Sequence, residues 1–168
     1  MESKKKLVFQ VLNIIGFIAT IVINSLANIL PIGYGNTGVL SDDIPNLFVP
    51  IGLTFSIWSV IYILLGLFVI YQARDVFKKE GEKIDMPFQD KISFYFILSS
   101  VANIVWIFLW HYKQIFLSLI AMLVLLISLL VIYISLNIGK AEVSRNVKLF
   151  VHLPFSVYLG WITVATIA

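Results

Sequence analysis

The sequence predicts an all-α integral membrane protein, a bundle of five transmembrane helices. Of its 168 residues, 60% are hydrophobic and only 12% are charged, whereas soluble domains carry about 25% charged residues. Five stretches without Asp, Glu, Lys or Arg also reach the roughly 20 residues that cross a bilayer as a helix. Strands of a membrane barrel would alternate apolar and polar residues, and runs such as residues 123–127 (LVLLI) do not. Lipid is therefore the predicted solvent for most of the chain.

The predicted helices form a single transmembrane domain. Their expected ranges are 7–31, 47–72, 92–110, 114–138 and 149–168. The segment 111–114 is so short that the third and fourth helices must be antiparallel neighbours. Loop 32–46 is rich in glycine and other turn-forming residues, and loop 73–91 mixes both charge signs, so we expect a solvated connector there. The last helix ends at Ala168 without a polar or basic flank, which leaves open whether the natural chain continues.

The basic residues predict an orientation. Lys4, Lys5 and Lys6 precede the first helix, and the loops after the second and fourth helices hold most of the others, whereas the loop after the first helix holds none. Under the positive-inside rule this distribution places the N-terminus in the cytoplasm. We expect an integral protein of a prokaryotic plasma membrane. Because orientation explains the net charge of +3, no nucleic-acid partner is expected.

Polar residues form a stripe on the first helix. At about 100° per residue, Gln10, Asn13, Asn24 and Asn28 fall within a sector roughly 60° wide. Polar side chains in lipid are costly unless they face protein or water. This stripe is therefore predicted to face the interior of the bundle.

Aromatic and small residues form stripes on three other helices, and these stripes contain all four tryptophans. The second helix presents Phe55, Trp58, Tyr62 and Gly66; the third presents Ser99, Asn103, Trp106 and Trp110; the fifth presents Pro154, Tyr158, Trp161 and Ala165. Tryptophan also gathers at membrane interfaces, and Trp110 fits that alternative equally well. The stripes are compatible with a ligand pocket or with a packed aromatic core, which spacing alone does not distinguish. The fourth helix is mostly aliphatic and is predicted to be a packing or lipid-facing wall.

Catalytic chemistry is not indicated. The chain has no cysteine, and no carboxylate lies in a predicted span. His111 and His152 lie near helix ends, where an interfacial or capping role is favoured over a metal or haem ligand. We therefore expect a protein that is not an enzyme and that holds neither a metal nor a resident cofactor.

Three segments resemble the tryptophan-rich sensory protein family, also called TspO, translocator protein or peripheral benzodiazepine receptor-like proteins. Residues 50–66 resemble the second-helix signature, with Pro50 and the aromatic stripe that follows it. Residues 103–106 resemble its Asn-x-x-Trp motif, and residues 158–166 resemble its fifth-helix Tyr-Leu-Ala-Trp-x-x-Phe-Ala-Thr motif. Val157 stands where the family usually has proline. The chain is thus identified as a divergent member, with the motifs in register over nearly its whole length.

The resemblance implies a five-helix bundle, often a homodimer, with a pocket between the helices that is covered by the first loop. It implies hydrophobic ligands: porphyrins and other tetrapyrroles, sterols, or synthetic benzodiazepine-type compounds. By motif position, the residues implied to line or border the pocket are Trp58, Asn103, Trp106, Trp161 and Ala165.

The hypothesis that combines stripes and resemblance is a membrane receptor or sensor for a hydrophobic small molecule. Its expected ligand-binding residues are Phe55, Trp58, Tyr62, Asn103, Trp106, Trp110, Tyr158, Trp161 and Ala165. Such sites are mostly apolar with a few placed polar groups. One alternative is a small transporter or channel whose polar path is the amide stripe of the first helix. Another is a structural membrane protein whose stripes only bury helix interfaces.

Overall fold

The computed structural model describes residues 3–30, 32–35, 37–42 and 52–167. Every regular element in this part of the chain is helical, and five helical segments there are long and apolar enough to cross a membrane. The predicted all-α membrane bundle is confirmed. The elements are α1 (Ser3–Ile29), α2 (Thr37–Asp42), the 3₁₀ turn η1 (Gly52–Ser56), α3 (Ile57–Ala73), the 3₁₀ turn η2 (Glu80–Glu82), α4 (Phe88–His111), α5 (Ile115–Ser135), α6 (Arg145–Val147), the π-helical η3 (Lys148–His152) and α7 (Leu153–Ile167).

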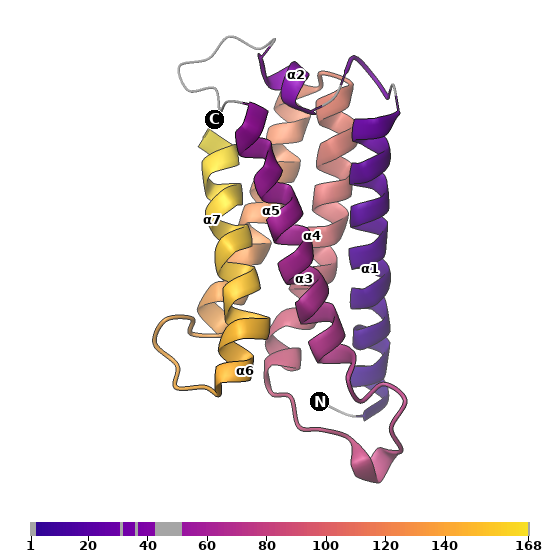
Figure 1. The fold of residues 1–168 in the computed structure, drawn as a ribbon, viewed down its shortest axis with the longest axis vertical. Helices are drawn as coiled ribbons and strands as arrows, with labels where there is room; N and C mark the ends of the chain where they lie inside the picture. Colours follow the sequence, from indigo (N-terminus) through magenta and orange to yellow (C-terminus); the bar gives the residue numbers. More distant parts are fainter. Residues whose placement is uncertain (1–2, 31, 36, 43–51, 168) are drawn as a thin grey trace.

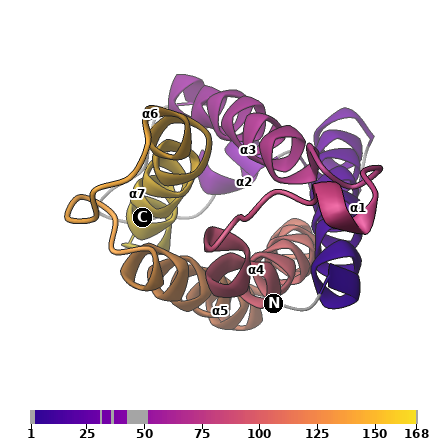
Figure 2. The same cartoon turned by 90° about the horizontal axis from the view of Figure 1, so that it is seen from below.

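The long helices form a closed ring in the order α1, α4, α5, α7 and α3, in which each helix packs against two neighbours. Figure 2 looks along this ring, and Figure 1 shows the helices running up and down the long axis. As the short connection predicted, α4 and α5 pack side by side. The short helix α2 crosses the end of the bundle where α1 finishes, opposite the N-terminus (Figure 1).

Several helix ends differ from the predicted ranges. α1, α4 and the continuous run α6–η3–α7 each begin four residues earlier than predicted, because a helix continues into the polar interface after it leaves the hydrocarbon. α5 ends at Ser135 rather than Ile138, since Asn137 has a positive φ of 52°, a left-handed conformation that ends a right-handed helix. Loop 32–46 contains the helix α2, which was not predicted. Residues 47–51 of the predicted second helix lie outside the described residues.

The last transmembrane segment contains a π-helical stretch. The five residues of η3 directly precede α7, in which Pro154 is the second residue. Proline lacks a backbone N–H and its ring clashes with the carbonyl four residues earlier. A widened turn before the proline accommodates both effects, and π-turns of this kind are local features inside α-helices.

Three buried phenylalanines close the middle of the bundle. Phe68 of α3, Phe96 of α4 and Phe155 of α7 contact one another edge to face, with ring centroids 5.0–5.8 Å apart, and each is at most 1% exposed. Edge-to-face geometry is the favoured arrangement of aromatic rings. This phenylalanine cluster lies on the N-terminal side of the tryptophans, which pack into the same core farther along the bundle.

Candidate functional site

Two tryptophans stack face to face at the centre of the site. Trp58 projects from α3 and Trp106 from α4, with ring centroids 5.9 Å apart and ring planes 25° from parallel. Tyr62 stacks on Trp58 at 5.7 Å, and Trp110 stacks on Trp106 at 6.3 Å. The spacing of three or four residues along each helix places these rings above one another. The result is one column of four aromatic rings.

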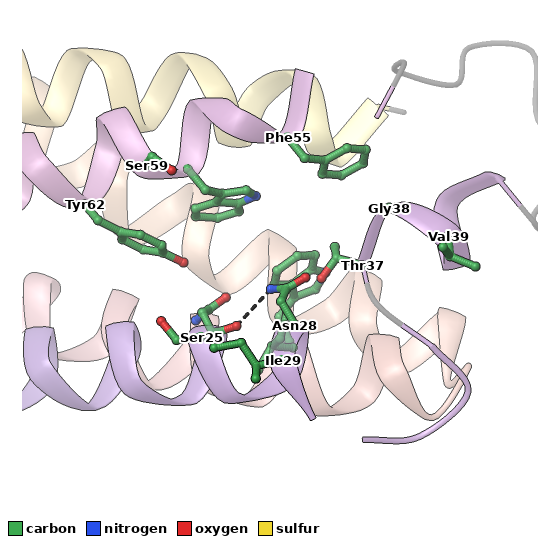
Figure 3. Close-up of a pocket in the computed structure, with 13 residues that line it drawn as sticks. Ser25, Asn28, Ile29, Thr37, Gly38, Val39, Phe55, Ser59 and Tyr62 are labelled. Atoms are coloured by element: carbon green, nitrogen blue, oxygen red, sulfur yellow. Dashed lines mark hydrogen bonds between the residues drawn. The ribbon is translucent and has the colours of Figure 1, made fainter. Parts of the chain in front are cut away.

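The larger cavity, about 610 Å³, lies on the α1 side of this column. Figure 3 shows Tyr62 directed from α3 across the opening toward α1, with Phe55 and Thr37 near its α2 end. Volumes of about 300–1,000 Å³ are typical of small-molecule sites. The lining residues are Asn24, Ser25, Asn28, Ile29, Thr37, Gly38, Val39, Phe55, Trp58, Ser59, Tyr62, Trp106 and Ile107.

A smaller cavity, about 60 Å³, lies on the α5 and α7 side. It shares Phe55, Trp58, Trp106 and Thr37 with the larger cavity. Its other lining residues are Ser41, Trp110, Met122, Trp161 and Ala165. The Trp161 ring meets Trp58 edge-on at 6.2 Å. The stacked tryptophans therefore form a partition between the two cavities.

Two buried polar groups at the cavities have no partner within the described residues. They are the indole Nε1 of Trp161 and the hydroxyl of Thr37, on side chains that are 8% and 6% exposed. A buried donor without a partner costs roughly 1–3 kcal/mol. Because both side chains line the smaller cavity, a ligand that brings a hydrogen-bond acceptor there would satisfy them.

A chain of hydrogen bonds runs beside the aromatic column. Asn24 of α1 donates to the side-chain oxygen of Asn103 at 2.7 Å, and the Asn103 amide donates to the Tyr158 hydroxyl at 3.2 Å. All three side chains are buried. Neither Asn103 nor Tyr158 is among the described residues that line these two cavities, but Trp58 contacts the Tyr158 ring at 6.1 Å. This chain fixes α1, α4 and α7 around the rings that do line the cavities.

The amide stripe of α1 is divided between the two ends of the bundle. Asn24 and Asn28 line the larger cavity, whereas Gln10 and Asn13 lie at the N-terminal end and are fully buried. There Asn13 donates to Gln72 at 3.0 Å, and Gln10 donates to the Gln72 backbone carbonyl. The stripe is therefore divided in role: Asn24 and Asn28 lie at the larger cavity, whereas Gln10 and Asn13 fasten α1 to α3.

An ion pair completes the contacts at the N-terminal end. The Lys6 ammonium donates to Asp75 at 2.6 Å and to the Ile84 carbonyl. Gln10 and the Ile84 backbone N–H also donate to the Asp75 carboxylate, at 2.8 and 2.9 Å. Burial alone would raise the pKa of Asp75, but the hydrogen bonds from Lys6, Gln10 and Ile84 and the charge of Lys6 outweigh it, so the pKa lies below its usual value.

Helix α2 and the turn before it cover the opposite end. The indole N–H of Trp110 donates to the Thr37 carbonyl at 3.4 Å, and the Tyr34 N–H donates to the His111 carbonyl at 3.0 Å. Gly33 has a φ of +65° and lies so close to His111 that a Cβ would overlap the carbonyl oxygen. Glycine is required there because it tolerates positive φ. The end of α4 thus holds α2 over both cavities.

Seven of the nine expected ligand-binding residues line a cavity: Phe55, Trp58, Tyr62, Trp106, Trp110, Trp161 and Ala165. Asn103 and Tyr158 lie directly behind them. Sequence reasoning missed the contributions of α2, namely Thr37, Gly38, Val39 and Ser41, and those of Ser25, Ile29, Ser59, Ile107 and Met122. Spacing from the known stripes would have indicated Ser25, Ser59 and Ile107, which lie three or four residues from Asn28, Tyr62 and Asn103. Nothing in the pattern marked α2.

The two histidines do not form a metal centre with other side chains in the part of the chain that the structure describes. His111 is fully buried, and its Nδ1 lies 2.7 Å from the Ile107 carbonyl. An interfacial or capping role was expected for it; His111 is the last residue of α4 and lies beneath the covering turn. His152 is also buried, at the start of the last helical segment.

Comparison with known proteins identifies the family. No curated protein matches the chain, and no solved structure does. The family model described as "TSPO-like protein" matches residues 10–168. That match includes most of the first membrane-spanning helix, the other four membrane-spanning helices and the residues that line both cavities. The chain is therefore a member of the TSPO-like protein family, an integral membrane protein whose helices enclose an aromatic site.

Proposed function

We propose that this protein is a membrane receptor or sensor that binds a flat hydrophobic ligand, of tetrapyrrole or sterol type, against the Trp58–Trp106 partition. The observation that carries the proposal is the 610 Å³ cavity directly beside two stacked indoles. Aromatic rings also contact a second π-system edge to face, the mode that stays open because Trp58 and Trp106 already stack with other rings of the column. The cavity is also large enough for a drug-sized molecule.

The polar groups of the site define which ligand fits best. The uncommitted donors of Trp161 and Thr37 favour a ligand with a hydrogen-bond acceptor at one edge. Asn28 lines the other side of the larger cavity, although its amide already donates to the Asn24 carbonyl at 2.8 Å. Described residues lining the two cavities include no charged side chain. The ligand would thus be held by edge-on aromatic contacts, burial and a few hydrogen bonds. We propose that no catalytic step follows binding.

The same proposal includes the membrane, the orientation and the oligomeric state of the receptor. All Lys and Arg residues except Lys113 lie at or beyond the helix ends on the side of the N-terminus, which favours a cytoplasmic N-terminus in a prokaryotic plasma membrane. A lipid-facing apolar groove between α4 and α5, lined by the exposed Val101, Val105 and Ile120, supports packing as a homodimer.

The two alternatives receive less support. A polar path along α1 would need Gln10 and Asn13 to face an opening, but both are buried and bonded to Gln72. A purely structural role for the stripes would need the aromatic rings to fill the space between the helices. A cavity of 610 Å³ beside them favours binding instead.

The test is a titration of the purified protein in detergent with protoporphyrin IX, followed by quenching of tryptophan fluorescence. We expect saturable quenching that weakens at least tenfold in Trp58→Ala and Trp106→Ala. Phe94→Ala is the matched control, because Phe94 is 61% exposed on α4 away from both cavities. Linear quenching that is equal in all variants would reflect partition into detergent and would refute tetrapyrrole binding at this site.

A further inference from the structure

A separate cavity of about 290 Å³ lies at the N-terminal end of the bundle, away from the tryptophans. It is formed where α3 ends, α4 begins, α5 ends and the last helical run begins. Its lining residues include Tyr71, Arg74, Asp85, Lys91 and His152, together with aliphatic side chains from the ends of the helices. None of these residues belongs to the two cavities of the proposed receptor site. One side of the cavity is apolar and the other carries charged groups.

Arg74 is held in position at the rim of this cavity. Its guanidinium lies 3.8 Å from the centroid of the Tyr71 ring and donates to the Tyr71 carbonyl at 3.2 Å. Tyr71 itself stacks with Phe88 and with Phe150, at centroid distances of 5.9 and 5.2 Å. A guanidinium has five N–H donors, and within the described residues Arg74 uses one for this bond. The remaining donors form a fixed fork suited to a phosphate.

The charges around the cavity favour an anion. Arg74 and Lys91 contribute two positive charges and Asp85 one negative charge, so the lining is net positive. His152 adds a ring that is 7% exposed, with two nitrogens able to form hydrogen bonds. Basic residues also surround this end of the molecule, which carries every Lys and Arg except Lys113.

The depth of the cavity indicates where the anion comes from. Tyr71 and His152 lie inside membrane-spanning segments, whereas Arg74 directly follows one, so the cavity crosses the boundary between hydrocarbon and water. Phe77, in the turn after α3, is 99% exposed, as expected for an aromatic side chain that enters the interface. A headgroup with attached acyl chains would meet charged and apolar walls together.

We propose that this cavity binds the phosphate headgroup of an anionic phospholipid in the leaflet at the N-terminal end, with Arg74 and Lys91 as its cationic ligands. Basic pockets between transmembrane helices bind lipid headgroups of this kind. The apolar wall, including Leu136, Val143 and Val147, packs against the start of the acyl chains. The lipid joins the ends of α3, α4, α5 and the last helical run.

Native mass spectrometry of the full chain in a neutral detergent tests this site. The probes are dioleoyl phosphatidylglycerol, dioleoyl phosphatidylcholine and inorganic phosphate. We expect tighter binding of phosphatidylglycerol than of phosphatidylcholine, weakened roughly fivefold in Arg74→Gln and in Lys91→Gln. Asp85→Asn should tighten binding by a similar factor because it removes the opposing charge. These opposite effects would not arise from a merely structural role.

Lys78→Gln is the matched control, because Lys78 is exposed at the same end but does not line the cavity. Its affinity for phosphatidylglycerol should equal that of the wild type. Equal binding of the two lipids, or unchanged affinity in both Arg74→Gln and Lys91→Gln, would overturn the proposal. Displacement of the lipid by submillimolar inorganic phosphate would show that the cavity binds a soluble phosphate compound, and it would overturn the proposal of a lipid ligand. Protoporphyrin quenching is measured in the same variants and should be unaffected, which separates this site from the receptor site.

Discussion

Asn24 and Asn103, which are 79 residues apart in the chain, share a buried hydrogen bond of 2.7 Å across the α1–α4 interface. The Asn103 amide in turn donates a hydrogen bond to the Tyr158 hydroxyl of α7. Three helices that are distant in sequence are thus fixed together immediately behind the aromatic column. Because no water is available in the bilayer core, a polar pair of this kind has few other partners.

A double-mutant cycle measures this relationship. Asn24→Ala, Asn103→Ala and the double variant should give a coupling free energy of about 0.5–1.7 kcal/mol, the range found for hydrogen bonds between membrane helices. The free energy of unfolding is measured in mixed detergent micelles of increasing denaturing-detergent content. Strictly additive effects of the two substitutions would show that the hydrogen bond contributes nothing to the stability of the fold.

Trp161→Phe tests the donor that faces the smaller cavity. The substitution keeps an aromatic ring beside Trp58 but removes an N–H that has no partner within the described residues. We expect about tenfold weaker binding of protoporphyrin IX, corresponding to one lost hydrogen bond of roughly 1.4 kcal/mol. Fluorescence titration measures the affinity and thermal unfolding measures the stability.

Trp110→Phe provides the matched comparison, because the Trp110 indole N–H already donates to the Thr37 carbonyl. Its thermal stability should fall more than that of Trp161→Phe, and its ligand affinity should fall less. If Trp110→Phe lowered the ligand affinity as much as or more than Trp161→Phe does, the Trp161 N–H would not contact the ligand.

Much of the fold followed from the sequence because lipid imposes a simple rule: charge-free stretches of sufficient length become helices. The rule fails where helices pass into water, as at Ser3 and Arg145, since charged residues are compatible with a helix there. It also gives no information on α2, a six-residue helix whose position depends on contacts with Trp110 and His111. Short helices have little intrinsic stability and are formed by tertiary packing.

The candidate site was partly predictable for a similar reason. Periodicity identifies which residues share a helix face, so Trp58, Trp106 and Trp161 were placed on the inner faces. Periodicity does not give the depth of a residue along the bundle. It therefore does not distinguish Gln10 from Asn24, which share a helix face but lie at opposite ends of α1. Gln10 donates to the Gln72 backbone and to Asp75. These contacts depend on the register of α1 against α3 and the turn after it, which neither segment shows alone.

Gly33→Ala tests how α2 is held over the cavities. A methyl group at this position, with φ of +65°, would overlap the His111 carbonyl oxygen, so the hydrogen bond from Tyr34 should be lost. We expect faster dissociation of protoporphyrin IX, by at least tenfold, with a modest change in thermal stability. Stopped-flow fluorescence after dilution measures the dissociation rate.

Gly81→Ala is the control for glycine replacement, since a Cβ there would meet nothing within 4 Å. It should leave the dissociation rate unchanged. If Gly33→Ala also left the rate unchanged, the turn before α2 would not control access to the site.

Lys6→Met tests the ion pair at the N-terminal end. Removal of the ammonium leaves the Asp75 carboxylate, which is fully buried, without its cation. Loss of one partner of a buried pair typically costs about 3–5 kcal/mol, so we expect a clear decrease in the free energy of unfolding. Lys5→Met, at an exposed neighbouring position on the same helix, should change it by less than about 0.5 kcal/mol. Equal effects of the two substitutions would contradict a stabilising role of the pair.

The pH dependence of stability provides an independent check on Asp75. Its pKa is lowered in the folded protein: burial acts to raise it, but hydrogen bonds from Lys6, Gln10 and Ile84 and the charge of Lys6 prevail. A lowered folded-state pKa gives stability that is present above the unfolded pKa of about 3.9 and is lost as the pH falls through the folded value. The melting temperature should therefore remain nearly constant between pH 7 and pH 5 as far as Asp75 is concerned, and fall below about pH 4. Asp75→Asn should have a lower melting temperature at pH 7 and a weaker acid dependence, because the amide cannot titrate. Parallel acid profiles for the two proteins would mean that other carboxyl groups determine the loss of stability.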